Sequence, residues 1–313
     1  MENVIKPERS KISLWVQAVR PFAYSGTAIP VILAAMLANT YFPGLMTWWL
    51  FPVALIAAML FQTAGNLLSD YYDYKSTVDS VDTFGSSRVL VEKLMTPKEI
   101  FTGGMVALII GFLLGLILVS YRGLPVLILG LIAVIFTYFY TAKPFELKYH
   151  ALGDLVIFIF YGPLLVIGAF YSFTGFYFYS LFWNLFWVSI PIGFLIVGVL
   201  HANNTRDIMH DTRANIKTQA SVLGIKGAQF EYYFLVVGAY LAVGIMIIFK
   251  ILSPWTLLVL ISLPPAIKNI KLMSKAEVEK PEVIAMLDVL TAQHHLLFGL
   301  LYCLGILLTK FFY

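Results

Sequence analysis

The chain has 313 residues, of which 60% are hydrophobic and only 12% are charged, and its formal net charge is +4. A soluble domain carries about 25% charged residues, so this composition excludes an ordinary soluble protein and indicates a membrane protein. The apolar residues form continuous runs instead of alternating with polar ones, which excludes a transmembrane β-barrel. The single cysteine, Cys303, excludes an internal disulfide and is expected to be a small core residue.

Nine apolar runs follow one another along the chain and are predicted to be membrane-spanning helices. In order, they cover residues 22–42, 48–68, 103–120, 124–140, 152–173, 182–202, 232–249, 254–270 and 289–308. No polar linker divides them, so residues 1–313 are expected to form one domain, an all-α polytopic bundle of about nine transmembrane helices. A helix is also expected to start after Thr96, because Thr96 and Glu99 form a capping-box sequence around a proline.

The basic residues are distributed unevenly over the loops. All but three of the 21 lysines and arginines precede the first run or lie in every second loop, the exceptions being Arg122, Lys250 and Lys310. The positive-inside rule then predicts a cytoplasmic N-terminus and an external C-terminus, and the odd number of runs agrees with this. We therefore expect an integral protein of a bacterial-type plasma membrane whose polar site faces the cytoplasm.

A first acidic segment stands where the second apolar run ends. Asn66, Asp70 and Asp73 are spaced so that they share one face if the helix continues through them. Gln62 lies one turn earlier on that face, and Asp79 extends the cluster into the next loop. A carboxylate in hydrocarbon costs about 2.5–3.5 kcal/mol, so acids clustered at the end of a membrane helix need a partner.

A second acidic segment stands where the sixth run ends and repeats the pattern with Asn203, Asp207 and Asp211. Each segment offers an amide oxygen and two carboxylates over two helical turns, which are ligands that Mg²⁺ prefers, with room left for phosphate oxygens. The repetition suggests two related halves facing one cavity. We expect both segments to bind Mg²⁺ and, through it, a diphosphate. Solvated acids paired with nearby lysines or arginines remain the alternative, which two matching segments make less favoured.

Basic and aromatic residues near the same helix ends are candidates for contacts with a diphosphate and an allylic cation. Arg88 and Lys148 are predicted to bind the diphosphate, and Arg206 lies inside the second acidic segment. Tyr140 and Tyr149 are candidates for facing a carbocation, because the negative face of an aromatic ring stabilises cations. Most tyrosines at these ends are expected to belong to the interfacial aromatic belt.

The histidines predict no zinc site. His201 precedes the second acidic segment and is interpreted as a packed polar residue, with a proton acceptor as the alternative. His210, His294 and His295 do not have the spacing of zinc ligands. The chain also lacks a P-loop, a dinucleotide fingerprint and a nucleophile elbow.

These motifs together resemble the UbiA family of intramembrane aromatic prenyltransferases, over nearly the whole chain from Arg20 onward. They are most similar to the branch that acts on 1,4-dihydroxy-2-naphthoate in menaquinone synthesis and to the related vertebrate menaquinone-4 enzyme. The matching segments are NLLSDYYDY at 66–74, SRVLVE at 87–92, LKY at 147–149, LGD at 152–154 and NNTRD at 203–207. The loop typical of the ubiquinone, haem and chlorophyll branches is replaced by GSSRVL at 85–90.

The resemblance implies nine helices and Mg²⁺-dependent transfer of a polyprenyl chain from its diphosphate to dihydroxynaphthoate, with loss of CO₂, giving demethylmenaquinol. It assigns metal binding to Asn66, Asp70, Asp73, Asn203, Asp207 and Asp211, and catalysis to those four aspartates with Arg88 and Lys148. Substrate contacts are expected from Asn66, Asn203, Arg206, Tyr140, Tyr149, Gln62 and Asp79.

One departure from the family pattern concerns the loop after the second acidic segment. The family usually continues with Gly-Lys-x-Thr, whereas this chain has Asn215, Ile216, Lys217 and Thr218. Another aromatic acceptor, such as homogentisate or 4-hydroxybenzoate, remains the main alternative. A membrane transporter and a CDP-alcohol phosphotransferase are less favoured, because the acids lie at helix ends and no Asp-Gly-x-x-Ala-Arg signature occurs.

Overall fold

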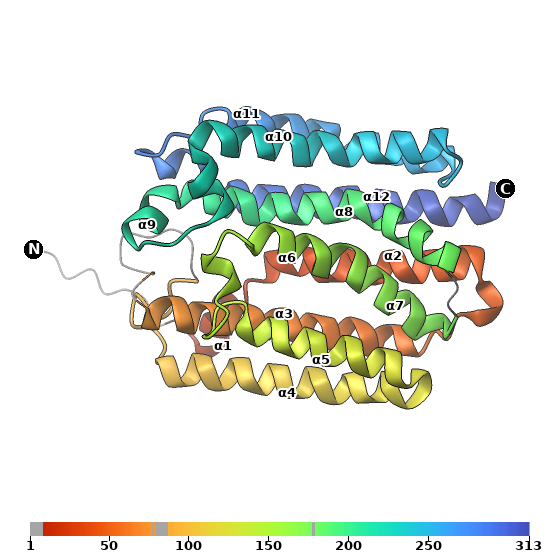
Figure 1. Cartoon of the computed structure of the whole chain (residues 1–313), viewed down its shortest axis with the longest axis horizontal. Helices are drawn as coiled ribbons and strands as arrows, with labels where there is room; N and C mark the ends of the chain where they lie inside the picture. Colours follow the sequence, from red (N-terminus) through yellow and green to blue (C-terminus); the bar gives the residue numbers. More distant parts are fainter. Residues whose placement is uncertain (1–8, 77, 79–86, 177–178, 313) are drawn as a thin grey trace, which may run out of the picture.

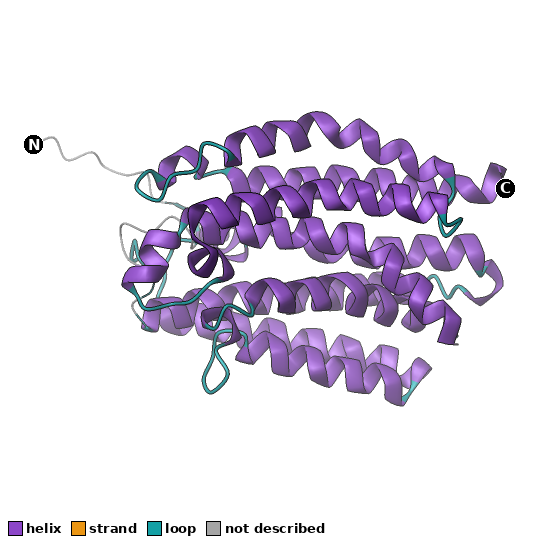
Figure 2. Cartoon of the chain, turned by 45° about the horizontal axis from the view of Figure 1, so that its top comes forward, coloured by secondary structure: helices purple, strands orange, loops and turns teal. Residues whose placement is uncertain are grey.

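The computed structural model describes residues 9–76, 78, 87–176 and 179–312 of the chain. Within these residues the secondary structure is helical, and the only β-type pairing is an isolated bridge between His150 and Lys217. Figure 2 shows helices joined by short loops, without any strand in the described part. The all-α prediction is therefore confirmed.

The helices follow the apolar runs of the sequence. They are α1 (Lys11–Val19), η1 (Pro21–Tyr24), α2 (Ser25–Tyr41), η2 (Pro43–Leu45), α3 (Leu50–Lys75), α4 (Pro97–Arg122), α5 (Leu124–Phe139), η3 (Leu147–Tyr149), α6 (Gly153–Ile159), η4 (Phe160–Leu164), α7 (Leu165–Thr174), α8 (Tyr179–Arg206), α9 (Ile208–Arg213), α10 (Gln219–Ile248), η5 (Pro254–Ser262), α11 (Leu263–Met273), η6 (Pro281–Ile284) and α12 (Leu287–Phe312).

In the described part of the chain, eight helical segments are long and apolar enough to cross a membrane, and α5 is a shorter apolar helix. Each of the nine predicted runs corresponds to one of these nine segments. The helix predicted to start after Thr96 is also present, since Thr96 accepts a hydrogen bond from the Glu99 amide and Glu99 accepts one from the Thr96 amide. Cys303 is buried in α12.

Several helix ends differ from the predicted ones because polar residues continue or interrupt the helices. The second run continues to Lys75, one helix through the whole first acidic segment. The fifth run is divided by a π-turn at Gly162 and Pro163, where Gly162 approaches the backbone of Gly193 in α8. Helix α8, by contrast, continues through Pro191 without interruption. The sequence did not predict α1, a short helix before the first run.

The long helices lie side by side, and the loops that carry the acidic segments gather at one end of the bundle. Figure 1 shows α1 and α9 at this end and the C-terminus at the other. Helices α8 and α12 cross the middle and pack against α10 and α2, while α3 packs on α4. The largest buried cluster joins α2, α7, α8, α10 and α12. Both acidic segments therefore reach the same end of the bundle.

Close packing of α12 on η5 depends on Gly305. A Cβ atom at this position would lie 2.6 Å from both Thr256 Cα and the Trp255 carbonyl oxygen, which are backbone atoms and cannot turn aside. We expect Gly305→Ala to lower the free energy of unfolding by about 1–3 kcal/mol. Gly244→Ala in α10 is the matched control, because nothing lies within 4 Å of its Cβ. Thermal unfolding in detergent measures both, and equal melting temperatures would contradict the packing argument.

Candidate active site

A cavity of about 620 Å³ lies inside the bundle, with one polar end and a long apolar part. Its apolar wall comes from α3, α4, α5, α7 and the η4 turn. Its polar end is formed by Asn66, Ser69, Asp73, Lys148, Asn203, Asn204, Arg206, Asp207, His210, Asp211, Thr218 and Asp288. The structure thus brings the two predicted acidic segments together at one cavity.

The first acidic segment presents Asp73 to the cavity. Asp73 accepts hydrogen bonds from Lys148 Nζ at 2.6 Å, the Tyr149 hydroxyl at 2.5 Å and Ser69 Oγ at 3.2 Å. Asn66 also lines the cavity and donates its side-chain N–H to the Val19 carbonyl oxygen at 3.0 Å, which leaves its amide oxygen for other contacts.

Asp70 has a different environment from Asp73. It is buried, forms an ion pair with Arg20 and accepts a hydrogen bond from Ser87. Arg20 and Ser87 line the cavity, whereas Asp70 is not among the described residues of its wall. In this structure Asp70 therefore holds Arg20 at the edge of the site.

The second acidic segment is not one continuous helix. Helix α8 ends at Arg206, Asp207 has φ −94° and ψ 7°, and α9 starts at Ile208. The amide of Asp207 still donates to the Asn203 carbonyl at 3.1 Å, and that of Asp211 donates to the Asp207 carbonyl at 2.9 Å. These bonds keep Asn203, Asp207 and Asp211 on the cavity side, as predicted, although the helix breaks between them.

The buried side chain of Arg206 forms hydrogen bonds with other residues of the second acidic segment. Its guanidinium donates to both carboxylate oxygens of Asp207, at 3.0 and 3.1 Å, and to Asn203 Oδ1 at 2.6 Å. It also donates to Asp288 in α12 at 3.0 Å. The side chain is 2% exposed, so its charge neutralises buried acids and joins α8 to α12.

The polar end fits a hard divalent cation. Asp73, Asp207 and Asp211 all line it, and Asn66 adds an amide. Burial, followed by the negative charge of Asp207, raises the pKa of Asp211 to about 7. Carboxylates crowded in this way disfavour one another's charge, and a divalent cation relieves the repulsion. Their oxygens are the ligand type that Mg²⁺ prefers.

The loop after α9 joins the two halves of the site. The carbonyl of Tyr149 accepts a hydrogen bond from the Lys217 amide at 3.2 Å, and the Ala151 amide donates to the Lys217 carbonyl at 2.5 Å. These two hydrogen bonds pair the Lys217 backbone with the loop that carries Lys148. Because this chain lacks the family glycine, the sequence left the geometry of this loop open. In the structure the loop turns at Asn215.

Asn215 takes the left-handed backbone conformation, with φ 57°. It ends α9 in a Schellman-type turn, in which the Ile216 amide donates to the Asp211 carbonyl at 2.8 Å and the Asn215 amide to the Thr212 carbonyl at 3.2 Å. Asparagine tolerates this conformation better than other residues except glycine, which explains why it stands where the family has glycine.

We therefore expect Asn215→Gly to keep or raise stability and Asn215→Ala to lower it by about 1–2 kcal/mol, the cost of placing a Cβ in the left-handed region. Thermal unfolding of the two variants in the same detergent measures the difference. An alanine variant as stable as the glycine variant would show that the turn does not require this conformation.

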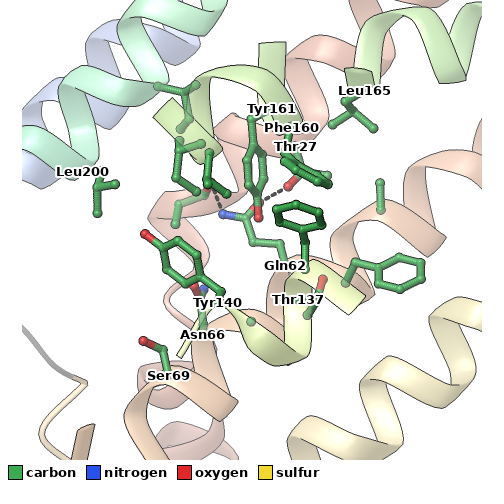
Figure 3. A pocket seen from close by; sticks show the side chains of 18 of the residues that line it. Thr27, Gln62, Asn66, Ser69, Thr137, Tyr140, Phe160, Tyr161, Leu165 and Leu200 are labelled. Carbon is green, nitrogen blue, oxygen red and sulfur yellow. Dashed lines mark hydrogen bonds between the residues drawn. The ribbon is translucent and has the colours of Figure 1, made fainter. Parts of the chain in front are cut away.

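The remaining predicted residues lie in different places. Gln62 lines the cavity, accepts a hydrogen bond from Thr27 and donates to the Ala23 carbonyl at 2.8 Å. Figure 3 shows Gln62 with Tyr140 in the cavity wall. Arg88 pairs with Glu92 at 2.9 Å and is not among the described residues of that wall. Asp79 lies outside the described residues.

His201 is part of a buried polar group beneath the second acidic segment. Its Nδ1 lies 2.8 Å from Asp154 Oδ2 and 3.6 Å from Glu231 Oε2. The ligand-type atoms of all three side chains lie within 4.8 Å of one another. The interpretation of His201 as a packed polar residue agrees with its full burial, and its direct bond to Asp154 explains how the ring is tolerated there.

Sequence reasoning assigned no role in the site to Asp288, Asn204, Asp154 or Arg20. Asp288 stands immediately before the ninth run, so its position at a helix end was an available signal of the same kind as the two acidic segments. Arg20 entered the sequence analysis only as one of the basic residues before the first run and as the start of the family resemblance. Nothing in the spacing of Asn204 and Asp154 indicates their hydrogen bond, because they belong to different helices.

Comparisons with known proteins agree with this architecture. Residues 27–290 match the model of the UbiA prenyltransferase family. The 1,4-dihydroxy-2-naphthoate octaprenyltransferase of Bacillus subtilis is 30% identical, over 99% of this chain and 97% of that protein. Human UbiA prenyltransferase domain-containing protein 1 is 30% identical, over 96% of this chain and 85% of that protein.

Solved structures show the same fold. A UbiA homolog from Aeropyrum pernix, solved in its apo form, has a TM-score of 0.66 at 15% identity, covering 93% of this chain and 98% of that one. A UbiA homolog from Archaeoglobus fulgidus bound to DMAPP and Mg²⁺ has a TM-score of 0.55 at 15% identity, covering 93% and 99%. The chain is an integral membrane protein that belongs to the UbiA prenyltransferase family of prenyl-transferring enzymes.

Proposed function

We propose that this protein transfers a polyprenyl chain from its diphosphate to 1,4-dihydroxy-2-naphthoate with loss of CO₂, forming demethylmenaquinol in menaquinone biosynthesis. The observation that carries the proposal is the single cavity whose polar end collects both acidic segments and whose remaining wall is apolar. A prenyl diphosphate has the same division into a charged head and an apolar tail. The 30% identity to the Bacillus subtilis enzyme supports dihydroxynaphthoate as the acceptor.

Mg²⁺ is the proposed cofactor, held by Asn66, Asp73, Asn203, Asp207 and Asp211 of the cavity wall, with Asp70 as the remaining predicted ligand. When bound, the metal supplies positive charge that offsets the charge of the departing diphosphate. Structures of a UbiA homolog from Archaeoglobus fulgidus bound to Mg²⁺ with DMAPP or with GPP support this choice.

The chain's own side chains have distinct proposed roles around the diphosphate. Lys148, whose ammonium group lies beside Asp73 at the cavity wall, stabilises the leaving group electrostatically, and Tyr149 orients Asp73 through its hydroxyl. Arg206 fixes Asp207 and Asn203 in place. Arg88 and Asp79 stay predictions as diphosphate contacts from the neighbouring loop.

The aromatic wall suits the allylic cation formed when the carbon–oxygen bond breaks. Tyr140, Phe160 and Tyr161 line the cavity beside Gln62 (Figure 3), and their ring faces stabilise positive charge. The apolar wall also limits the access of water to the cation before the electron-rich ring attacks it. The prenyl tail extends along the apolar part toward the opposite end of the bundle.

We further infer that residues 1–313 act as one domain in a bacterial-type plasma membrane, with the polar end of the cavity facing the cytoplasm. The basic loops support this orientation through the positive-inside rule. The unbroken course of α3 and α8 gives no support to the transporter alternative, in which discontinuous helices form the midplane site.

Product mass spectrometry tests the proposed function. Purified protein receives farnesyl diphosphate and Mg²⁺ with dihydroxynaphthoate, 4-hydroxybenzoate and homogentisate in competition. We expect a prenylated naphthoquinol that has lost CO₂ and that does not form in EDTA. Prenylation of a different acid would reassign the acceptor and reject this branch, and no product from folded protein would reject the proposed reaction.

A further inference from the structure

A chain of buried hydrogen bonds runs from α10 through α8 to α6 and ends at the cavity. His201 Nε2 lies 3.0 Å from the Ala228 carbonyl oxygen, and its Nδ1 lies 2.8 Å from Asp154 Oδ2. The other oxygen of Asp154 accepts a hydrogen bond from the side-chain N–H of Asn204 at 3.2 Å. His201, Asp154 and Asn204 are all buried, and Asn204 alone lines the cavity.

This chain of hydrogen bonds fixes which way the Asn204 side-chain amide points. The Ala228 carbonyl only accepts, so Nε2 of His201 carries a hydrogen. A hydrogen also lies between His201 Nδ1 and Asp154 Oδ2, and whichever of these two atoms carries it, Asp154 Oδ1 is an acceptor that faces Asn204. The NH₂ group of Asn204 must therefore face Asp154, which leaves Oδ1 turned from Asp154 as an acceptor. Among the described residues, none donates a hydrogen bond to this oxygen.

The adjacent Asn203 differs in this respect. Its Oδ1 accepts a hydrogen bond from Arg206 at 2.6 Å, as part of the network around the second acidic segment. Of the two neighbouring amides, Asn204 is thus the one whose carbonyl oxygen is not engaged by a described residue. Asp154, the hydrogen-bond partner of Asn204, lies in α6 and belongs neither to the two acidic segments nor to the predicted metal ligands.

A hydrogen-bond donor without a partner lies beside the same stretch of α6. The Tyr140 hydroxyl is buried and has no partner among the described residues. It lies close to Gly153, the residue before Asp154, where a Cβ atom would come within 3.1 Å of it. Figure 3 shows the Tyr140 ring in the cavity wall with its hydroxyl toward Leu200, one helical turn before Asn204.

We propose that Asn204 and Tyr140 bind a ring hydroxyl of the aromatic acceptor, with His201 and Asp154 as positioning residues that hold the Asn204 amide. A phenolic hydroxyl donates one hydrogen bond and accepts another, which matches an amide oxygen and a tyrosine hydroxyl in the wall of the same cavity. Leaving such buried groups unmatched is costly, so the pair selects acceptors that carry this hydroxyl. The inference rests on the proposed function, because it names a contact of the same substrate.

Steady-state kinetics of Asn204→Ala tests the contact. We expect the KM for dihydroxynaphthoate to rise about tenfold or more, the effect of one lost hydrogen bond to a buried group. The KM for farnesyl diphosphate and the Mg²⁺ concentration for half activity are expected to stay within about twofold of wild type. Asn204→Ser, which keeps a small polar side chain, should give the same rise and covers the case in which the alanine variant does not fold.

Acceptor analogues separate a contact from a structural role. Wild-type protein should bind dihydroxynaphthoate more tightly than its monomethyl ethers in competition assays, and the Asn204 variants should lose this preference. Asp154→Asn frees the Asn204 amide to turn, because an amide both donates and accepts, and is expected to weaken the same preference. Asn39→Ala, at the opposite end of the bundle beside Lys310, is the matched control.

Two results would overturn the inference while leaving the proposed function intact. One is an unchanged acceptor KM in folded, active Asn204 variants, and the other is a shift in Mg²⁺ dependence alone, which would make Asn204 a metal contact. Failure of wild-type protein to prenylate any aromatic acid would instead reject the proposed function, and the inference with it.

Discussion

Asp211→Asn is expected to reduce prenyl transfer by about 100- to 1000-fold, the range found when one preorganised electrostatic group is removed from an active site. Asp211 lies at the polar end of the cavity, where burial and the charge of Asp207 raise its pKa to about 7. Asparagine keeps the size of the side chain but loses the negative charge that attracts a divalent cation. The variant should therefore also need more Mg²⁺ for half of its remaining activity.

The hydrogen bond between the Thr218 hydroxyl and Asp211, at 3.1 Å, can be kept by the amide oxygen of the variant, so folding should be preserved. Glu279→Gln is the control. It removes one negative charge from an exposed loop residue and should leave turnover unchanged. Turnover is measured with product mass spectrometry over a Mg²⁺ series. Wild-type turnover and an unchanged Mg²⁺ series for Asp211→Asn would remove this carboxylate from the metal site.

Lys148→Gln carries the second largest expected effect, a loss of about 100-fold or more in kcat. Lys148 Nζ lies 2.6 Å from Asp73 Oδ2 and 3.4 Å from Ser69 Oγ, at the wall of the polar end. Glutamine has a similar reach and remains polar, but it brings no positive charge to a departing diphosphate. It also leaves the Asp73 carboxylate without its nearby cation.

Lys143→Gln is a matched control in the same loop. Lys143 is exposed and lies outside the described cavity wall, so its loss should change kcat by less than about twofold. The comparison cancels any general effect of net charge on the membrane surface. Equal activities of the two variants would show that Lys148 acts only as one of the basic loop residues that set the membrane topology.

Much of the fold follows from local chemistry that can be read along the chain. Continuous apolar runs predict helices because a buried backbone must satisfy its own hydrogen bonds, and a helix does so within one segment. The first acidic segment continues α3 to Lys75, as the helical spacing of Asn66, Asp70 and Asp73 indicates. The capping box at Thr96 likewise depends on residues three apart, so the sequence specifies it completely.

The same local rules were weaker at the second acidic segment. The shared face of Asn203 and Asp207 required one helix through both residues, whereas the helix breaks at Asp207. Arg206 donates hydrogen bonds to Asn203 and Asp207 and also to Asp288, which lies in a distant part of the sequence. The contact between Arg206 and Asp288 joins residues 82 positions apart, and no local pattern reports it.

The sequence by itself determined the class of protein, the positions of its membrane helices and the acids that point to a metal-bound diphosphate, because each depends on hydrophobicity or on spacing within one helix. Only the tertiary structure decided that Asp73 faces the cavity while Asp70 binds Arg20, that Arg206 joins two helices, and that Asp154 turns the Asn204 amide. Those outcomes depend on which side chains meet across different helices. Packing sets such meetings, since a buried donor or charge must find its partner wherever the fold places it.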